Sequence, residues 1–353
     1  MNFFTFDLFH ISTMNSYRAI ALQTKCYAVN RAKSKDEAGE IIKQTIERLS
    51  KQIFASIAFV GQDVKLVVLP EYFLTGFPMG ETVAEWREKA CLEFGGAEYE
   101  LLGEIASTRK IFLSGNAYEL DANFPELYFQ TCFIIAPSGD VILRYRRLNS
   151  MFAPTPHDVW EKYLDIYGLE KVFPVADTEI GKLAAIASEE ILYPEILRCL
   201  AMRGAEVFCH NTSEVFGSDR LPKNAAKICR AVENLAFVVS SNSAGIADCS
   251  IPENSTDGGS KIVDYRGIVL SETAQGESMA AFAEIDLDAL RRFRRRPGLM
   301  NITSRQRFEL YADSYAKNSF YPPNTLLDKK TDRAHFVETQ RGAIKKLEND
   351  GVI

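Results

Sequence analysis

The sequence lacks the clustered cysteines and histidines that disulfide frameworks and zinc sites require. Its seven cysteines are an odd number spread along 353 residues without a CxxC pair, which predicts reduced thiols and a cytoplasmic location. The four histidines stand far apart, and only Cys209 and His210 place the two ligand types side by side, so no zinc site is expected. The chain has no P-loop and no GxGxxG segment after a strand, and we therefore expect no cofactor.

Long apolar runs and a strong charge excess are missing as well. No run reaches the roughly 18 apolar residues that span a bilayer, and residues 1–15, which contain Asp7, predict an N-terminal extension rather than a signal peptide or anchor. Met14 is an alternative natural start. The 41 Lys and Arg against 47 Asp and Glu give a formal charge of -6, which offers no general attraction to phosphate or anionic lipid. Neither nucleic acid nor a membrane is expected as a partner.

The residues that are present predict a folded α/β protein. Apolar residues make up 46% of the chain and charged residues 25%, as in ordinary globular proteins. Strand-like apolar runs are each followed by a helical pattern, the order found when helices cover sheets, and no Gly- and Ser-rich linker interrupts the single domain expected over 16–285. The predicted strands cover 16–23, 65–69, 110–118, 128–135, 141–145, 183–187, 206–210, 236–241, 259–263, 268–270 and 280–285, and the predicted helices cover 36–59, 82–109, 191–203 and 220–235.

The tail over 286–353 differs from this body and is predicted to be a C-terminal arm. It contains the segment RRFRRRPG at 291–298, with five arginines in six residues. One interpretation is that these arginines pair with carboxylates of the chain's own body or of a neighbouring subunit. The other is a nucleic-acid patch, which the negative overall charge argues against.

Three segments place polar side chains directly after predicted strands, where an open sheet presents its ligand site. Glu71 follows 65–69, Arg147 follows 141–145, and Ser188 follows 183–187. Taken alone, Glu71 is either a surface carboxylate or a catalytic base. Ser188, followed by Glu189 and Glu190, is either a helix N-cap with acidic residues in the first turn or a nucleophile.

Together these segments resemble the nitrilase or carbon-nitrogen hydrolase superfamily over about 16–285. That family has an LPE motif with a general-base Glu, a YRK motif with a cationic Lys, and a Cys nucleophile six residues before the Pro of FPE. The resemblance implies a four-layer α-β-β-α sandwich. The matching segments are Leu69-Pro70-Glu71, Tyr145-Arg146-Arg147, Tyr193-Pro194-Glu195, Gly204-Ala205-Glu206, RAVEN at 230–234 and the hairpin at 259–267.

Two of the three central positions depart from the family pattern. Glu71 matches the Glu, but Arg147 stands at the Lys position and Ser188 at the Cys position. A cysteine thiol with a pKa of about 8.5 is partly ionised near neutrality, whereas a serine hydroxyl needs a well-placed base. Arginine does not give up its proton at accessible pH, although its fixed charge can stabilise an oxyanion.

The resemblance implies a divergent hydrolase or acyl-transfer enzyme acting on a small amide, nitrile or carbamoyl compound. Glu71 would be the general base, Ser188 the nucleophile and Arg147 the oxyanion stabiliser. The backbone N–H of Glu189 would be a second oxyanion donor. Substrate contacts are expected from Glu189, Glu190, Tyr193 and His157.

The same two substitutions have a second interpretation, loss of catalysis. The protein would then be a catalytically silent relative that binds a small ligand or a protein partner. Under either interpretation the resemblance implies a homodimer or higher homo-oligomer, with the helix around 191–203 and the C-terminal arm as candidate contacts.

Overall fold

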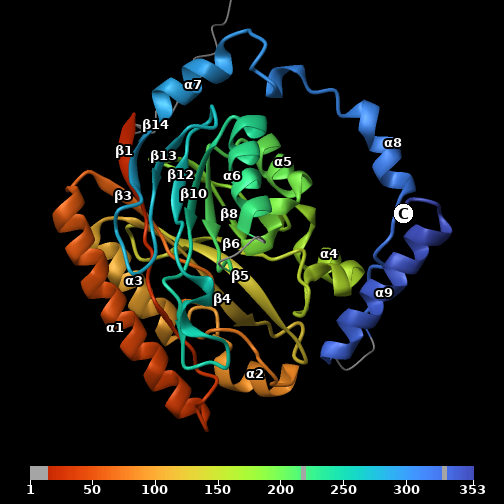
Figure 1. Ribbon diagram of the computed structural model, residues 1–353, viewed down its shortest axis with the longest axis horizontal. Coiled ribbons are helices and arrows are strands. Elements are labelled where there is room, and N and C mark those ends of the chain that lie inside the picture. The colour runs from red at the N-terminus through yellow and green to blue at the C-terminus, as the bar shows by residue number, and fades with distance from the viewer. Residues whose placement is uncertain (1–14, 216–219, 328–331) are drawn as a thin grey trace, which may run out of the picture.

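The fold is a stack of two sheets between layers of helices (Figure 1). The computed structural model describes residues 15–215, 220–327 and 332–353, and the expected N-terminal extension over 1–15 lies almost wholly outside these ranges. The order of layers is α-β-β-α, so the four-layer sandwich expected from the sequence is confirmed.

The first sheet contains the strand that precedes Glu71. Its three central strands run parallel to one another, whereas the strands outside them pair antiparallel. Figure 1 shows helices from the first third of the chain against its outer face. In spatial order the strands are β14 (Phe282–Asp286), β1 (Ser16–Ala21), β3 (Val64–Val68), β4 (Phe112–Leu120), β5 (Tyr128–Ile135) and β6 (Val141–Arg146).

The second sheet contains the strand that precedes Ser188. Its β8, β9 and β10 are parallel, and antiparallel strands lie on both sides of them. In spatial order the strands are β13 (Val269–Glu272), β12 (Lys261–Val263), β10 (Phe237–Ser241), β9 (Val207–Asn211), β8 (Gly181–Ala187) and β7 (Ala176–Thr178), and β2 (Cys26–Tyr27) pairs separately with β11 (Ile246–Ala247).

The helices cover the outer faces of the two sheets and build the arm. None of those within the described ranges is both long and apolar enough to cross a membrane. The α-helices are α1 (Lys35–Val60), α2 (Val83–Ala90), α3 (Ala97–Arg109), α4 (Trp160–Tyr167), α5 (Pro194–Met202), α6 (Arg220–Asn234), α7 (Leu287–Arg295), α8 (Glu309–Lys317) and α9 (Arg333–Asn349), and the short 3-10 helices are η1 (Pro156–Val159), η2 (Leu169–Lys171), η3 (Ser188–Leu192), η4 (Glu253–Thr256) and η5 (Thr303–Arg305).

Alternating side chains on the strands bury both faces of the first sheet. On β1, Ala19 and Ala21 face the core between the two sheets, whereas Ile20 packs into the core beneath α1 and α3. On β5, Cys132 faces the inter-sheet core and Phe133 faces the helices. Because side chains alternate with a period of two along a strand, a continuous apolar run is what this doubly covered sheet requires.

The single helix predicted over 82–109 is wrong. The chain forms α2 and α3 with an extended segment between them, in which Leu92 bridges to Glu119 of β4. Gly95 has a φ of +74° and Gly96 is the N-cap of α3. Glycine adopts that left-handed conformation without a Cβ penalty, so the pair lets the chain turn where the helical pattern would have continued.

The start of the C-terminal arm is docked on the chain's own body, as one interpretation of the arginine run predicts. The guanidinium of Arg291 binds both carboxylate oxygens of Glu206, with Nε to Oε1 at 2.7 Å and Nη2 to Oε2 at 2.9 Å. Arg294 donates to the backbone carbonyls of Ala205 and Leu235. These bonds attach α7 to the end of the second sheet.

Replacing Glu206 by glutamine should loosen this attachment. Burial alone would raise the pKa of Glu206, but hydrogen bonds from Arg291 and from the Lys182 backbone outweigh it and lower the pKa. The stability linked to the carboxylate is therefore present above the ordinary glutamate pKa and lost as the pH falls. Urea denaturation near pH 7 should show a loss of about 1–3 kcal/mol in Glu206→Gln, and the difference from wild type should shrink below about pH 4.

The matched control is Asp177→Asn, because Asp177 forms an exposed ion pair with Lys182 at 3.6 Å. Its removal should change the free energy of unfolding by less than about 0.5 kcal/mol. Equal losses in the two variants would contradict a specific role for the bond between Arg291 and Glu206.

Candidate active site

The three polar positions that follow predicted strands lie in one buried cluster. Glu71 comes after β3, Arg147 after β6 and Ser188 after β8. Glu71 and Arg147 follow strands of the first sheet and Ser188 follows a strand of the second, and Arg147 Nη1 is 3.1 Å from Glu71 Oε1. Burial raises the pKa of Glu71, and side-chain hydrogen bonding with Ser188 opposes part of that rise, which indicates that the two side chains lie close together. All three are almost fully shielded from solvent.

Glu71 is a buried carboxylate with one engaged and one open oxygen. Its Oε1 accepts hydrogen bonds from Gln130 Nε2 at 2.7 Å and from Arg147. Its Oε2 is buried and has no partner of good hydrogen-bond geometry within the described residues, Ser188 included. Burial raises the pKa of Glu71, and the charges of Arg147 and Lys223 oppose that rise. A raised pKa brings a carboxylate closer to the range useful for proton transfer.

Arg147 forms ion pairs with the carboxylates of Glu71 and Glu189. Its Nη1 donates to Gln130 Oε1 at 2.6 Å and to Glu71, its Nη2 donates to Glu189, and its Nε donates to the Asn149 carbonyl at 2.6 Å. Burial alone would lower the pKa of Arg147, but the carboxylates of Glu189 and Glu71 raise it well above its ordinary value. The guanidinium therefore stays charged, and most of its N–H groups have partners.

Ser188 stands at a strained turn between β8 and η3. Its φ is +41°, a conformation that a residue with a Cβ rarely adopts. Such strain persists only where the surroundings enforce it, and it is common at functional positions. The Ser188 carbonyl bonds to His210 Nε2 at 2.8 Å, and its Oγ accepts from Lys223 Nζ at 3.4 Å.

His210 supports this turn as a neutral ring. It is fully buried on β9, and burial together with the charge of Lys227 lowers its pKa to about 3. Because a carbonyl only accepts, Nε2 carries the proton that is donated to Ser188. The other nitrogen, Nδ1, then accepts from Ser240 Oγ at 2.9 Å. The ring holds the backbone of Ser188 and does not face its hydroxyl.

Glu190 ties the two sheet ends together. Its Oε1 accepts from the backbone N–H groups of Leu148 at 2.7 Å and Asn149 at 3.1 Å, and from Tyr145 Oη at 2.9 Å. Its Oε2 accepts from the N–H of Ala187 at 3.3 Å. One carboxylate thus binds the residue before Ser188 and the residue after Arg147. Three of its four donors are backbone N–H groups, and the fourth is the Tyr145 hydroxyl.

The other three substrate-binding candidates lie in different places. Glu189 is partly exposed and bonds to Arg147 at the edge of the cluster. Tyr193 is 42% exposed at the start of α5. His157 lies in η1, and its contacts within the described residues are with Trp160 and with Tyr321 and Asn324 of the arm. The structure brings Glu189 to the cluster and places His157 against the arm.

Two residues of the cluster were not predicted from the sequence. Gln130 bridges Glu71 and Arg147 from the middle of β5, and a polar residue inside a wholly buried strand is a signal that could have identified it. Lys223 of α6 contacts Ser188 across 35 residues of sequence. No local pattern marks Lys223, because a lysine near a helix start ordinarily faces solvent.

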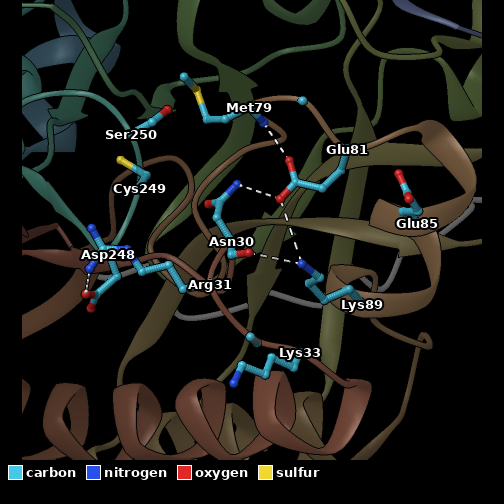
Figure 2. A pocket seen from close by; sticks show the side chains of 12 residues that line it. Asn30, Arg31, Lys33, Met79, Glu81, Glu85, Lys89, Asp248, Cys249 and Ser250 are labelled. Atoms are coloured by element: carbon cyan, nitrogen blue, oxygen red, sulfur yellow. Dashed lines mark hydrogen bonds and ion pairs between the residues drawn. The ribbon is translucent and has the colours of Figure 1, made fainter.

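A charged hollow lies apart from this cluster. It has a volume of about 630 Å³ and is lined by residues of the loops after β2 and β3, by residues of α2, and by Asp248, Cys249 and Ser250. Figure 2 shows its Glu81 bonded to Asn30 and to the N–H of Met79. None of the described lining residues belongs to the cluster around Ser188. Its charged groups mostly pair with one another.

Metal ligands are not grouped in the part of the chain that the structure describes. There, no set of three or more His, Cys, Asp or Glu side chains is placed to hold a metal ion. All seven cysteines, which fall within the described ranges, are free.

Comparison with known proteins gives a family match over most of the chain. The family described as carbon-nitrogen hydrolase matches residues 18–295. Among curated proteins, Nitrilase homolog 2 of Dictyostelium discoideum is 26% identical over 250 residues, which is 70% of this chain and 72% of that protein. Deaminated glutathione amidase of Synechocystis is 24% identical over 293 residues, 80% of this chain and 96% of that protein.

Other matches cover less of the relative or show the fold alone. Formamidase of Helicobacter acinonychis is 29% identical over 186 residues, 52% of this chain and 51% of that protein. The crystal structure of Nit3 of Saccharomyces cerevisiae, a nitrilase-superfamily member, matches with a TM-score of 0.62 at 20% identity, over 81% of this chain and 96% of that one. The carbon-nitrogen hydrolase of Helicobacter pylori gives 0.63 at 19% identity, over 85% and 98%.

Removing the Glu190 carboxyl should change how stability depends on pH. Burial raises the pKa of Glu190 to about 7, against the opposing charge of Arg147 and the hydrogen bonds that it accepts. The stability linked to its proton is therefore present below the ordinary glutamate pKa and lost as the pH rises through about 7. Glu190→Gln has no such proton. Between about pH 5 and pH 8, the free energy of unfolding of wild type, measured by denaturation, should fall by up to about 3 kcal/mol relative to that of the variant. A difference between the two proteins that does not vary with pH would refute this assignment.

Proposed function

Since this chain belongs to the carbon-nitrogen hydrolase family, we propose that it is an amidase- or nitrilase-type hydrolase or acyl-transfer enzyme with Ser188 as its nucleophile. The substrate class is a small amide, nitrile or carbamoyl compound. Relatives named formamidase, deaminated glutathione amidase and nitrilase support that class. Glu71 is the general base, and Arg147 stabilises charge in the same site.

The observation that carries this proposal is that the Ser188 hydroxyl, the Glu71 carboxylate and two cations lie together in a buried cluster beyond the ends of β3, β6 and β8. Oε2 of Glu71 is the oxygen without a good partner among the described residues; burial raises the pKa of this carboxyl, and hydrogen bonding with Ser188 opposes part of the rise. The backbone of Ser188 is strained and held by His210. A held, strained hydroxyl next to a base with a raised pKa is the arrangement that nucleophilic catalysis uses.

For an amide the first half of the reaction is acylation of Ser188. The oxygen Oγ forms a bond to the carbonyl carbon, its proton passes to Glu71, and the carbonyl π electrons move onto the carbonyl oxygen. The C–N bond then breaks as Glu71 gives the proton to the leaving nitrogen. Water attacks the resulting ester, Glu71 takes a proton from that water, and Ser188 leaves with the proton. Atoms and charges balance over the cycle.

Four further residues are proposed around this step. The backbone N–H of Glu189, in the first turn of η3, donates to the developing oxyanion. The side chains of Glu189, which is partly exposed, and of Tyr193, which is exposed, contact the substrate. Glu190 acts through the backbone that it holds. His157 contacts substrate only if the arm against which it packs also reaches the site.

The Ser188→Ala variant should lose turnover while remaining folded. With a panel of small amides and nitriles, we expect kcat/KM of this variant to fall by at least about a thousandfold. We expect a comparable fall in the kcat/KM of Glu71→Gln. In wild type, the acid limb of the pH profile should lie above the ordinary glutamate pKa, because burial raises the pKa of the base. Mass spectrometry of wild type with substrate should show an acyl adduct on the peptide that contains Ser188. Full turnover by Ser188→Ala would eliminate this nucleophile.

A second candidate function is that of a catalytically silent family member. The specific observation in its favour is that Arg147 is bound to four acceptors, two of which are the carboxylates of Glu71 and Glu189. A panel without turnover, together with a ligand that raises the melting temperature, would favour this alternative. Gain of hydrolysis by the double variant Ser188→Cys, Arg147→Lys would then show that the pocket is intact.

We further propose that two copies of the chain associate. The arm runs outward from α7 through α8 and returns to α9 (Figure 1), and every residue of α8 is exposed in the single chain. Leu310 and Tyr315 of α8 are each 63% exposed, and Met202 of α5 is 50% exposed. Covering these apolar side chains with a second copy would remove them from water.

Light scattering after gel filtration should therefore give twice the 39.6 kDa mass of one chain. Charged substitutions at both positions of α8, Leu310→Glu and Tyr315→Glu, should shift the mass toward one chain. A wild-type mass equal to one chain would refute the association.

A further inference from the structure

The Ser188 hydroxyl is contacted by a cation that comes from outside the three family motifs. Lys223 lies near the start of α6, which packs against β10 and β12 of the second sheet (Figure 1). Its Nζ is 3.4 Å from Ser188 Oγ, and its side chain is half-buried. Contacts between α6 and η3 hold the helix beside the turn that carries Ser188.

Lys223 differs from Arg147 in what surrounds it. Arg147 has carboxylates on two of its nitrogens. Among the residues that the structure describes, no carboxylate lies within ion-pair distance of Lys223, and Ser188 is its hydrogen-bond partner. An ammonium has three donors. Lys223 therefore keeps donors for a ligand at Ser188, whereas Arg147 uses most of its donors to hold Glu71 and Glu189.

The charge of Lys223 affects the pKa values of three other groups in and around the site. It opposes the rise in pKa that burial causes at Glu71, which follows β3, and it contributes to the lowered pKa values of His210 on β9 and of Glu214 beyond β9. The deeper cation, Lys227, is placed differently, because it is fully buried and its Nζ is 2.8 Å from Glu214 Oε1. Of these two lysines on one face of α6, Lys223 is the one that contacts the hydroxyl.

From this geometry we infer that Lys223 is the cation that stabilises the oxyanion formed at Ser188, a role that rests on the proposed function. When Oγ bonds to the carbonyl carbon, the new oxyanion sits on the same carbon and so lies next to Oγ. Lys223 Nζ donates to that oxygen and remains an ammonium, while the proton of Ser188 passes to Glu71. The cation of the YRK motif, Arg147 here, holds the base and Glu189 in place.

Thiol titration in a Ser188→Cys background tests this inference without requiring turnover. The rate of iodoacetamide alkylation of the peptide around position 188, followed by mass spectrometry against pH, reports the thiol pKa. Replacing a cation in contact with a thiolate should raise that pKa by about one unit or more. At about pH 7 we therefore expect Lys223→Met to slow alkylation about tenfold and Lys223→Arg to retain most of the rate.

The matched control is Lys182→Met, because Lys182 lies on the same strand that leads to Ser188 but pairs with Asp177 at the surface. It should leave the alkylation profile unchanged. An unchanged thiol pKa in Lys223→Met, with circular dichroism equal to that of the parent, would overturn the inference. So would equal shifts in the Lys223 and Lys182 variants.

The two proposals fail in different ways. If the thiol pKa responds to Lys223 but no substrate is turned over by wild type, the position of Lys223 stands and the hydrolase does not. If wild type turns over substrate through Ser188 while Lys223→Met keeps its kcat, the hydrolase stands and the role of Lys223 is refuted. In the oxyanion role, Lys223→Met lowers kcat with KM little changed, because the contact forms chiefly in the transition state.

Discussion

The arrangement of the site depends on the buried carboxylate of Glu190. It accepts hydrogen bonds from the backbone N–H of Ala187, the last residue of β8, and from those of Leu148 and Asn149, which follow β6 of the other sheet. Ser188 and Arg147 are each one residue away from these anchors, so one side chain constrains the positions of both. A buried carboxylate is stable only where several donors face it, and Glu190 has four. This bonding and the hydrogen bond from His210 to the Ser188 carbonyl together hold the strained Ser188 in position.

Charge balance is the second constraint on the cluster. Arg147 lies between the carboxylates of Glu71 and Glu189, and Lys227 is paired with Glu214 below them. His210 is kept neutral by burial and by the charge of Lys227. Removing one member of a buried pair leaves an uncompensated charge, so these groups act as one electrostatic unit. Lys223 stands at the side of this unit that faces the hydroxyl.

The two departures from the family pattern have a common structural context. A serine is less acidic than a cysteine and gains more from a base with a raised pKa and from a nearby cation. Glu71 has the raised pKa, and Lys223 is the nearby cation. The larger, forked guanidinium at 147 reaches Glu189 as well as Glu71 and Gln130. The same contacts explain why a silent relative is the competing interpretation, since they also satisfy the site without a ligand.

The sequence by itself determined the α/β class, most strands and the three motif positions, because alternation along a strand and apolar spacing on a helix are local properties. One interpretation of the sequence was that arginines of the arm pair with carboxylates of the body, and Arg291 forms such a pair with Glu206. The sequence did not predict the break at Gly95 and Gly96, since a positive φ is not visible in a helical pattern. Only the tertiary structure decided that Glu190 faces backbone, that His157 packs on the arm and that Lys223 reaches Ser188. These contacts join residues 35 to more than 160 positions apart, and their partners are chosen by how the two sheets and the arm stack, which no local window of sequence records.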